Sequence, residues 1–321
     1  MQRLRSSKSA IALAAAVLLI MGCGGNKQES KNSPDSKAKS TKLTIGVSLL
    51  TRTHPFYQEL EAGLNEAASE YGYDLLVAAG EFDVARQKDQ VQDFIVRKVD
   101  AIILSPCDSK SIGTSIKAAN DAGIPVFTAD IACLVEGVKV VSHIASDNIA
   151  GGHLAAQAIA KALNGSGKIA IIDHPEVESV IQRVKGFEDE LAGSENIQIV
   201  AKLSGHGVKD QAFRTAEDIL QAHPDLDAVF GINDDSALGA LAAVEKAGKT
   251  GRVIIVGFDA VPEAREAIKA GKIYADVIQR PHEIGRKAIE AVKEYISGGD
   301  VPSTILIPCG LYTQQDALQA N

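Results

Sequence analysis

Polar and aromatic side chains follow several apolar runs of this sequence, at the points where each run ends. They are His54, Phe56, Tyr57, Ser105, Asp130, Asn233, Asp259 and Gln279. Carboxylates and carboxamides exchange hydrogen bonds with vicinal hydroxyls, and an aromatic face covers the apolar side of a sugar ring. A single acid after a strand caps the next helix as often as it binds a ligand, and Asp234 before Ser236 is such a candidate. As a set, these residue types favour a polyol site.

The elements that would position these side chains alternate regularly from residue 43 onward. Short β-branched or aliphatic runs predict strands at 43–49, 74–78, 101–104, 124–128, 138–143, 168–172, 197–203, 228–232, 252–257 and 273–278. Amphipathic stretches between them predict helices at 55–71, 85–97, 109–122, 150–163, 178–192, 210–222, 236–247, 262–270 and 281–297, and an extended tail follows at 304–312. Continuous apolar strands that alternate with helices indicate parallel sheets covered on both faces.

Two doubly wound α/β halves account for this alternation better than one (β/α)₈ barrel. The strands at 124–128 and 138–143 follow each other with no room for a helix, which breaks the repeat of a barrel. A chain of 321 residues is long enough for two domains. In doubly wound sheets, ligands bind beyond the carboxyl ends of the strands, where the polar set lies.

Four segments resemble the ribose-binding branch of the periplasmic sugar-binding (type I solute-binding) family. They are VSHIASDN at 141–148, AHPD at 222–225, NDDSALGAL at 233–241 and VGFD at 256–259. The resemblance extends from about residue 41 to the end of the chain and implies two Rossmann-like lobes joined by a three-strand hinge. The N-terminal lobe would comprise 43–146 with 280–308, and the C-terminal lobe 147–279 with 309–321.

The resemblance also implies ligand contacts, residue by residue. His54 and Ser105 stand in place of asparagines, Phe56 and Tyr57 match two ring-stacking aromatics, and the rest of the set is unchanged: Asp130, Asn233, Asp259 and Gln279. The family has arginines where this chain has Ile131 and Ile181. It also has an aromatic residue in the second lobe where this chain has His206 and Gly207. Each lost guanidinium removes a fork of hydrogen-bond donors. The changes therefore favour a deoxy-sugar, a polyol or an amino-bearing small molecule over ribose.

The first 22 residues are typical of an export signal. Three basic residues precede an eleven-residue apolar run at 10–20, which is shorter than the roughly 20 residues that cross a bilayer. The sequence Ile-Met-Gly-Cys at 20–23 resembles a bacterial lipobox. We therefore expect a lipoprotein signal peptide at 1–22, lipidation at Cys23 and a flexible tether at 23–42. The protein would lie in the periplasm or on the outer face of the cell membrane, held by lipid alone.

Charge separates this leader from the body of the chain. The net charge is −8, but residues 1–42 contain eight basic and two acidic side chains, so the other 279 residues carry −14. An acidic body is unsuited to nucleic acid, whose phosphates require clustered Lys and Arg. The export signal also argues against a sugar-responsive DNA-binding repressor, a class that uses the same two-lobe fold.

Neither catalytic motifs nor metal motifs are present in the sequence. It lacks HExxH, GxSxG, a P-loop and a GxGxxG after a strand, and its histidines are scattered. We expect no enzyme, cofactor or metal, but a monomeric solute-binding protein that closes about its hinge and delivers its solute to the permease of an ABC importer. A sensor lipoprotein that presents a sugar-like or amino-bearing ligand to a receptor is an open alternative.

Three cysteines remain beside Cys23, so at least one thiol is unpaired. They are Cys107, Cys133 and Cys309, and their spacing matches no zinc pattern. An exported protein permits disulfides, and Cys133 is a candidate partner for either of the other two.

Overall fold

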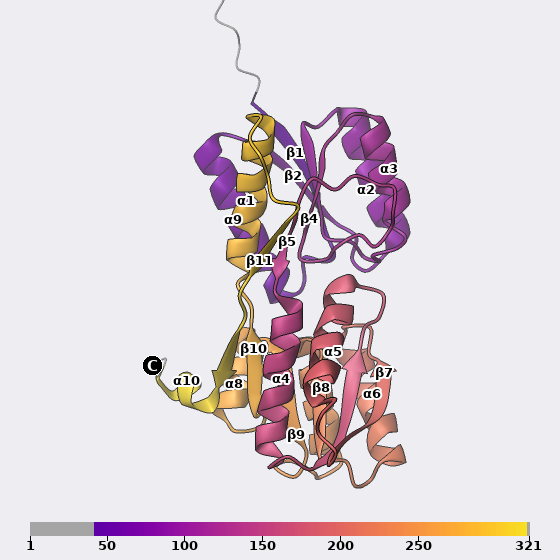
Figure 1. Cartoon of the computed structure of the whole chain (residues 1–321), viewed down its shortest axis with the longest axis vertical. Helices are drawn as coiled ribbons and strands as arrows, with labels where there is room; N and C mark the ends of the chain where they lie inside the picture. The colour runs from indigo at the N-terminus through magenta and orange to yellow at the C-terminus, as the bar shows by residue number, and fades with distance from the viewer. Residues whose placement is uncertain (1–41, 320–321) are drawn as a thin grey trace, which may run out of the picture. The chain divides into compact units, whose positions relative to one another are not determined.

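The computed structural model describes residues 42–319 of the chain, as two lobes that each contain one six-stranded sheet (Figure 1). The predicted signal peptide, the lipidation site Cys23 and nearly all of the tether fall outside the described residues. The first sheet has the order β11-β5-β4-β3-β1-β2, with neighbouring strands parallel. Its strands are β1 (Thr44–Leu49), β2 (Asp74–Ala79), β3 (Ala101–Leu104), β4 (Val126–Ala129), β5 (His143–Ser146) and β11 (Thr304–Ile307).

The second sheet has the order β12-β10-β9-β8-β6-β7, and only β12 runs antiparallel to its neighbour. Its strands are β6 (Gly167–Asp173), β7 (Ile197–Ser204), β8 (Ala228–Gly231), β9 (Ile254–Asp259), β10 (Ala275–Ile278) and β12 (Gly310–Thr313). Inner strands such as β3 and β8 are buried along their whole length, as parallel strands covered on both faces require. The predicted two-lobe α/β fold is confirmed.

Helices cover both faces of each sheet. On the first sheet, α1 (Pro55–Tyr71) and α9 (Pro281–Ile296) pack together on one face, and α2 (Val84–Arg97) and α3 (Gly113–Asp121) on the other. On the second, α4 (Asn148–Ala162) and α5 (Glu178–Leu191) cover one face. The opposite face carries α6 (Lys209–Ala222), α7 (Asp234–Lys246), α8 (Pro262–Lys269) and α10 (Gln314–Gln319).

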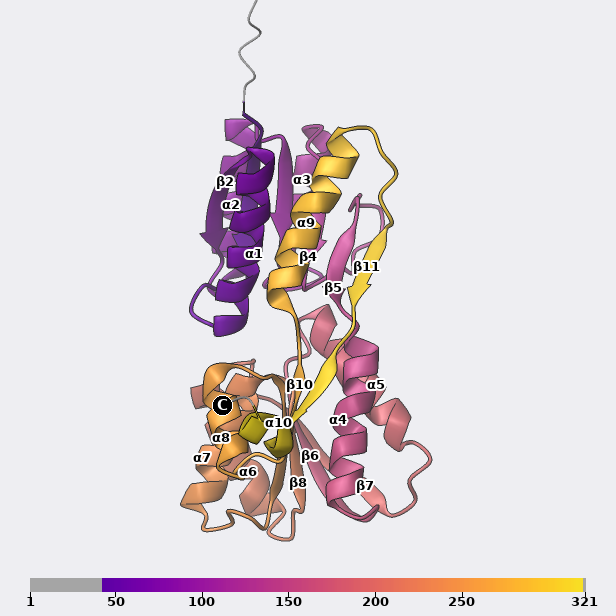
Figure 2. The same cartoon turned by 90° about the vertical axis from the view of Figure 1, so that its left-hand side faces the viewer.

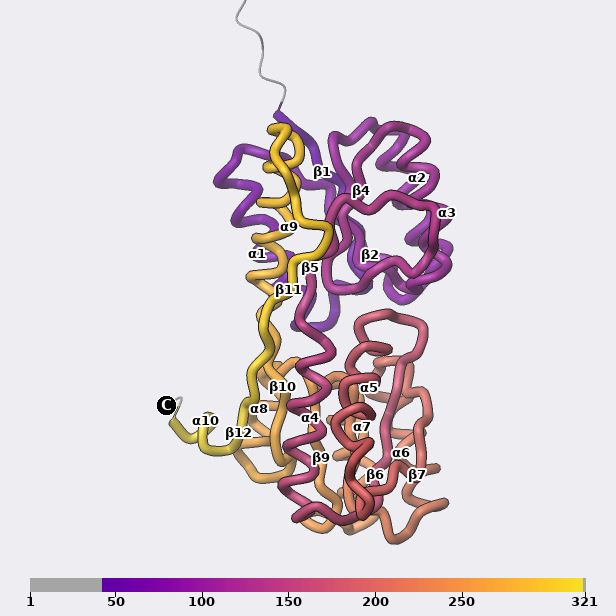
Figure 3. Tube along the Cα trace, in the orientation of Figure 1, coloured from indigo at the N-terminus to yellow at the C-terminus, as the bar shows by residue number. Residues whose placement is uncertain are grey.

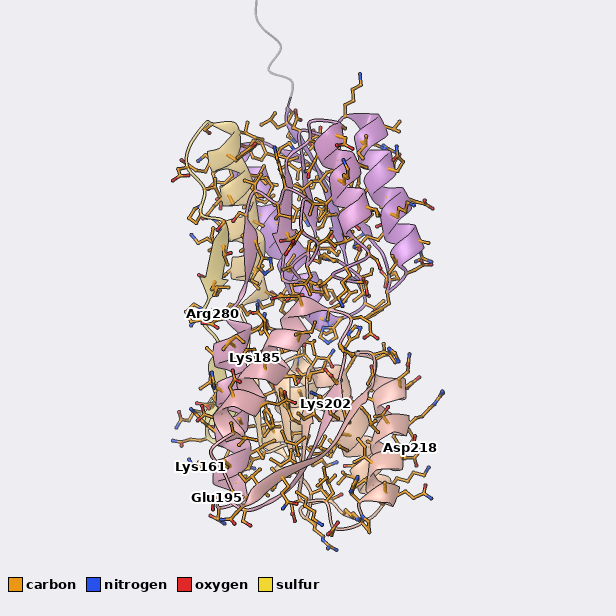
Figure 4. All side chains as sticks on the ribbon, turned by 45° about the vertical axis from the view of Figure 1, so that its right-hand side comes forward. Lys161, Lys185, Glu195, Lys202, Asp218 and Arg280 are labelled. Carbon is orange, nitrogen blue, oxygen red and sulfur yellow. The ribbon has the colours of Figure 1, made fainter. Side chains whose placement is uncertain are left out.

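The chain passes between the two sheets three times, at β5–α4, β10–α9 and β11–β12 (Figures 2 and 3). The second passage ends at Arg280, which lies at the junction of the lobes (Figure 4). Because of these crossings, α9 packs on the first lobe although it follows the second in sequence. The residue boundaries given above for the two lobes stay a prediction.

One predicted strand is misplaced. The segment expected to pair at 138–143 runs outside the sheet for most of its length, and β5 begins at His143. The side chain of Asn120 holds this segment instead, since its Nδ2 donates to the Lys139 carbonyl at 3.0 Å and its Oδ1 accepts from the Lys139 amide at 2.7 Å. The β-branched residues there predicted a strand, but the side chain of Asn120 takes the place of a strand partner.

Neither of the two candidate pairings of Cys133 forms a disulfide among the described residues. Cys107, Cys133 and Cys309 are all free thiols. Burial raises the pKa of the Cys107 thiol to about 12 and that of Cys309 to about 11, so both are protonated at neutral pH.

Among residues 42–319, no helix has the length and apolar character needed to cross a membrane.

Helices α1 and α9 approach so closely that only glycine fits between them. A Cβ at Gly63 would lie 2.1 Å from the carbonyl oxygen of His282, and a Cβ at Gly285 would lie 2.2 Å from that of Leu60. The two helices therefore pack backbone to backbone, which brings α9 onto the first lobe.

We expect Gly63→Ala to destabilise the protein by about 2 kcal/mol or more, because the added methyl group must push the helices apart. The free energy of unfolding from urea titration measures this. Gly193→Ala is the matched control, since Gly193 has no atom within 4 Å of its would-be Cβ and needs no positive φ. Equal stability of the two variants would contradict the close packing.

Candidate functional site

A cavity lies between the carboxyl ends of the two sheets. We call it the ligand cavity. Eight of the ten predicted ligand residues line it: His54, Phe56, Tyr57, Asp130, Ile131, Asn233, Asp259 and Gln279. Ser105 and Ile181 are not among its lining residues. Ser105 directly follows β3 and is fully buried, and Ile181 is 40% exposed on α5.

The first turn of α1 brings His54 and two rings to the cavity. The imidazole of His54 caps the helix, because its Nδ1 accepts from the amide of Phe56 at 3.2 Å. Its Nε2 is buried, has no hydrogen-bond partner and lies 3.7 Å from Asp259 Oδ2 in the other lobe. The rings of Phe56 and Tyr57 meet edge to face, with centroids 5.1 Å apart. One nitrogen of His54 is therefore used locally, and the other is available to a ligand.

Asp130 follows β4 in a left-handed backbone conformation, with φ of 68°. Its Oδ2 accepts from the hydroxyl of Tyr57 at 2.7 Å, while Oδ1 is buried without a partner. Burial raises the pKa of Asp130 to about 6, against the opposing effects of Arg183 and of the Tyr57 hydrogen bond. Burial and the Asp130 charge also raise the pKa of Tyr57, so the phenol stays a donor. Asp130 thus has one carboxylate oxygen free to accept from a ligand hydroxyl.

Asp259 ends β9 on the opposite side of the cavity and is tied to the hinge. Its Oδ1 accepts from Gln279 Nε2 at 2.6 Å, and Gln279 Oε1 accepts from Ser146 Oγ at 2.5 Å. Ser146 precedes the first passage between lobes and Gln279 lies in the second. Burial raises the pKa of the Asp259 carboxyl, and the charges of His54 and Arg183 oppose that effect. A group that binds Asp259 therefore acts on a chain of hydrogen bonds that joins two hinge segments.

A guanidinium also lines the cavity, contrary to the expectation that both arginine positions are lost. Arg183 is buried on α5, donates from Nε to Asn148 Oδ1 and from Nη1 to the Ile232 carbonyl, both at 2.8 Å, and stacks 3.9 Å from the Phe258 ring centroid. Arg183 lies two residues after the exposed Ile181 and gives the cavity a cation that the sequence did not predict. Ile131 is buried in the lining, so that wall is apolar.

Asn233, and not Asp234, caps α7. Asn233 Oδ1 accepts from the amide of Ser236 at 2.9 Å, and its Nδ2 donates to the Gly207 carbonyl at 3.1 Å. The predicted cap, Asp234, points inward beneath the cavity, where its Oδ2 accepts from the amide of Val261 at 2.6 Å. Asn233 therefore shapes the lining through two structural bonds of its own.

Two further rings in the lining were missed. Phe82 follows β2 and His174 follows β6, so the carboxyl-end rule would have included both had it been applied to these strands. Arg183 has a different signal, since it is the one basic residue on the buried face of α5, which also carries Val180, Val184 and Phe187. Among residues 42–319, no cluster of three His, Cys, Asp or Glu side chains is suited to a metal ion.

The sequence matches the periplasmic binding protein domain over residues 45–300. The chain belongs to the periplasmic binding protein family. It is 35% identical over 283 residues to the ribose import binding protein RbsB of Bacillus subtilis, covering 88% of this chain and 91% of that protein. It is 32% identical to a D-apiose import binding protein of Paraburkholderia graminis, over 98% of this chain and 97% of that one.

Solved structures of this family are similar throughout the two lobes. A solute-binding protein of an ABC transporter from Bacillus halodurans, solved with bound myo-inositol, has a TM-score of 0.81 at 31% identity and covers 88% of this chain and 98% of its own. One from Actinobacillus succinogenes, solved with D-allose, has a TM-score of 0.80 at 30% identity and covers 87% and 100%. This periplasmic binding protein is accordingly an exported, extracytoplasmic solute-binding protein and not an enzyme.

Two carboxyl groups face each other beneath the ligand cavity of this periplasmic binding protein. Asp234 and Asp276 are fully buried, and a Cβ at Gly257 would lie 3.0 Å from Asp234 Oδ1 and 2.9 Å from Asp276 Oδ2. Burial raises the pKa of Asp276 to about 7. Burial and the neighbouring Asp276 also raise the pKa of Asp234 well above its usual range, so the pair retains a proton at neutral pH.

This pair makes stability fall as the pH rises. A carboxyl with a folded pKa of about 7 and an ordinary value of 3.8 binds its proton more tightly in the folded state, so its contribution is complete at low pH and is lost between about 4 and 7. We expect Asp276→Asn to be about 2 kcal/mol more stable than the parent protein at pH 8, with a smaller difference at pH 4.

Urea unfolding at several pH values measures this difference. Asp218→Asn is the control, because Asp218 is exposed on the outer side of α6 (Figure 4). The same pH dependence in parent and Asp276→Asn would show that the pair holds no extra proton.

Proposed function

We propose that this chain is the receptor of an ABC importer and binds one monosaccharide or related polyol in the ligand cavity. The observation that carries the proposal is a pair of buried, unpartnered polar atoms on the cavity wall, His54 Nε2 and Asp130 Oδ1. Buried polar atoms without partners are costly, and a ligand hydroxyl would supply the missing hydrogen bonds. The rings of Phe56 and Tyr57 beside them suit the apolar face of a sugar.

The proposed contacts come from both lobes. The first lobe would contribute His54, Phe56, Tyr57, Asp130 and Ile131, and the second Arg183, Asn233, Asp259 and, at the hinge, Gln279. Ser105 would act from behind the wall and Ile181 would make no contact. Because Arg183 is present and Ile131 is apolar, we expect the ligand to place hydroxyls toward Asp130, Asp259 and Arg183 and a carbon without a hydroxyl toward Ile131. Deoxy-sugars have this pattern, since one of their carbons carries hydrogen in place of a hydroxyl. With Arg183 in the cavity, the argument against ribose is weaker than the sequence alone suggested.

Hinge closure is the proposed binding mechanism, and contacts between the lobes support it. The amide of Ser109 donates to the Glu176 carbonyl at 3.0 Å, and Ser109 Oγ accepts from the amide of Glu178 at 2.9 Å. These bonds join the loop after β3 to the loop after β6 and to the first residue of α5. A ligand that touches both lobes favours the closed arrangement by its extra contacts in that state. The closed pair of lobes would then be recognised by the permease.

Asp259→Ala tests the site. We expect an affinity loss of about 100-fold or more, since two charge-assisted hydrogen bonds are worth about 3 kcal/mol together. Titration calorimetry with ribose, D-allose, myo-inositol and xylitol identifies the solute and measures the loss. Asp218→Ala should bind like the parent protein. Unchanged affinity in Asp259→Ala, with a normal unfolding curve, would reject the assignment, and no binding of any solute to the parent protein would reject the function.

The same proposal includes membrane attachment of the monomeric protein by a lipid on Cys23. We expect expression of the full chain in a bacterium to yield a membrane-bound protein with a diacylglycerol-modified first residue after cleavage at residue 22. Cys23→Ser should release the protein into the soluble fraction, because one thioether-linked anchor provides the whole attachment. Mass spectrometry of the N-terminal peptide reads the modification directly. An unmodified Cys23 in the parent protein would refute lipidation.

A further inference from the structure

A second hollow, the rim pocket, adjoins the ligand cavity. Its lining includes Val84, Asp108, Glu176 and His206, while Phe82 and His174 line both spaces. These two rings come from different lobes, one after β2 and one after β6. Their centroids lie 6.4 Å apart at an interplanar angle of 42°. Phe82 and His174 therefore form the wall that separates the ligand cavity from the rim pocket.

The backbone holds Phe82 in place at a cost. Glu81 and Phe82 both have positive φ, 52° and 61°, which is unfavourable for residues other than glycine. The carboxylate of Glu81 fixes the turn by accepting from Thr51 Oγ1 at 2.6 Å and from the Arg52 amide at 3.1 Å. As a result, a phenyl ring that is 41% exposed is held over the cleft. Strain of this kind persists only where the surrounding contacts impose it.

His174 fills space that a side chain at residue 207 would otherwise enter. A Cβ at Gly207 would lie 3.0 Å from His174 Nδ1, and the backbone there has φ of +65°, which suits glycine. Burial lowers the pKa of the imidazole, so the ring is neutral at pH 7. The ring of His206 continues the row outward, 6.3 Å from that of His174.

We propose that Phe82 and His174 form a size gate that limits this protein to solutes of one sugar ring with no substituent at the end facing the rim pocket. This inference rests on the proposed function and adds its size limit. With either ring removed, the ligand cavity opens into a space with polar groups from Asp108, Glu176, His206 and Gln211, which suit the hydroxyls of a second sugar. The wild-type protein would thus reject glycosides and disaccharides whose first ring it accepts.

The test compares solute selectivity in matched variants. The unsubstituted probes are the four solutes named above. The extended probes are the methyl glycosides of ribose and allose, the galactoside of myo-inositol (galactinol) and xylobiitol. Each is titrated calorimetrically. We expect the wild-type protein to prefer its unsubstituted solute to the extended derivative by about 100-fold or more, since a clash with a fixed wall rejects the longer one. Phe82→Ala and His174→Ala should reduce this preference to about tenfold or less, because the obstruction is gone.

Two controls separate a gate from other roles of these rings. Phe82→Tyr keeps a ring in the wall and should retain wild-type selectivity. Val84→Ala alters a residue that is 40% exposed and lines the rim pocket alone, so its selectivity should also be unchanged.

The outcomes are distinguishable. Phe82→Ala could bind both the unsubstituted solute and its extended derivative more weakly, with the wild-type ratio of affinities. The ring would then be only a closure contact, and the gate would be overturned. A wild-type protein that binds a solute and its derivative equally would overturn it as well. Failure of the wild-type protein to bind any of the probes would overturn the proposed function, and the gate with it.

Discussion

One buried guanidinium organises the cleft. Arg183 hydrogen-bonds to Asn148 and to the carbonyl of Ile232, so it joins α5, the start of α4 and the end of β8. Asn148 in turn donates to the carbonyl of Ser146, whose hydroxyl donates to Gln279, and Gln279 donates to Asp259. This continuous path connects a charged group in the cavity wall with two of the three passages between lobes. A charge buried this deeply has to be satisfied by fixed polar partners, and one of them, Asn148, lies at the first passage between the lobes.

Part of the negative charge of the two lobes lies in and beneath the ligand cavity. Asp130 and Asp259 face the cavity from opposite lobes, and each has Arg183 among the charges that lower its raised pKa. Asp234 and Asp276 lie behind Asp259, and glycine at 257 leaves room for both. The site thus has two layers of carboxyl groups, an outer one that is partly neutralised by Arg183 and an inner one that is neutralised by a proton. Hydrogen bonding from the inner layer to Val261 shapes the turn that carries Asp259.

The fold was predictable because its signals are local and repeated. Continuous apolar runs such as Ala101–Leu104 are strands wherever both faces are covered. The helix at Pro55–Tyr71, which begins at a proline and is followed by a glycine, was predicted to the residue. The β5 error arose where a side chain, Asn120, replaced a strand partner, which no pattern of β-branched residues reveals. Strand ends located most of the cavity lining for the same local reason. Arg183 lies within a helix, and its place in the cavity depends on how α5 packs against β8 and α4, which is a tertiary property.

Closure and selectivity meet at the loop after β6. Glu176 and Glu178 hydrogen-bond to Ser109 of the first lobe. His174, two residues before Glu176, faces Phe82, which also belongs to the first lobe. The bonds that hold the lobes together are therefore adjacent to the ring that closes the end of the cavity. A solute too long for the cavity would meet His174 before Ser109 could reach its partners, so an oversized solute would be excluded by failing to complete closure. A permease that recognises the closed lobes responds only to completed closure. The loop after β6 would therefore determine both which solutes fit and whether the permease detects a bound solute.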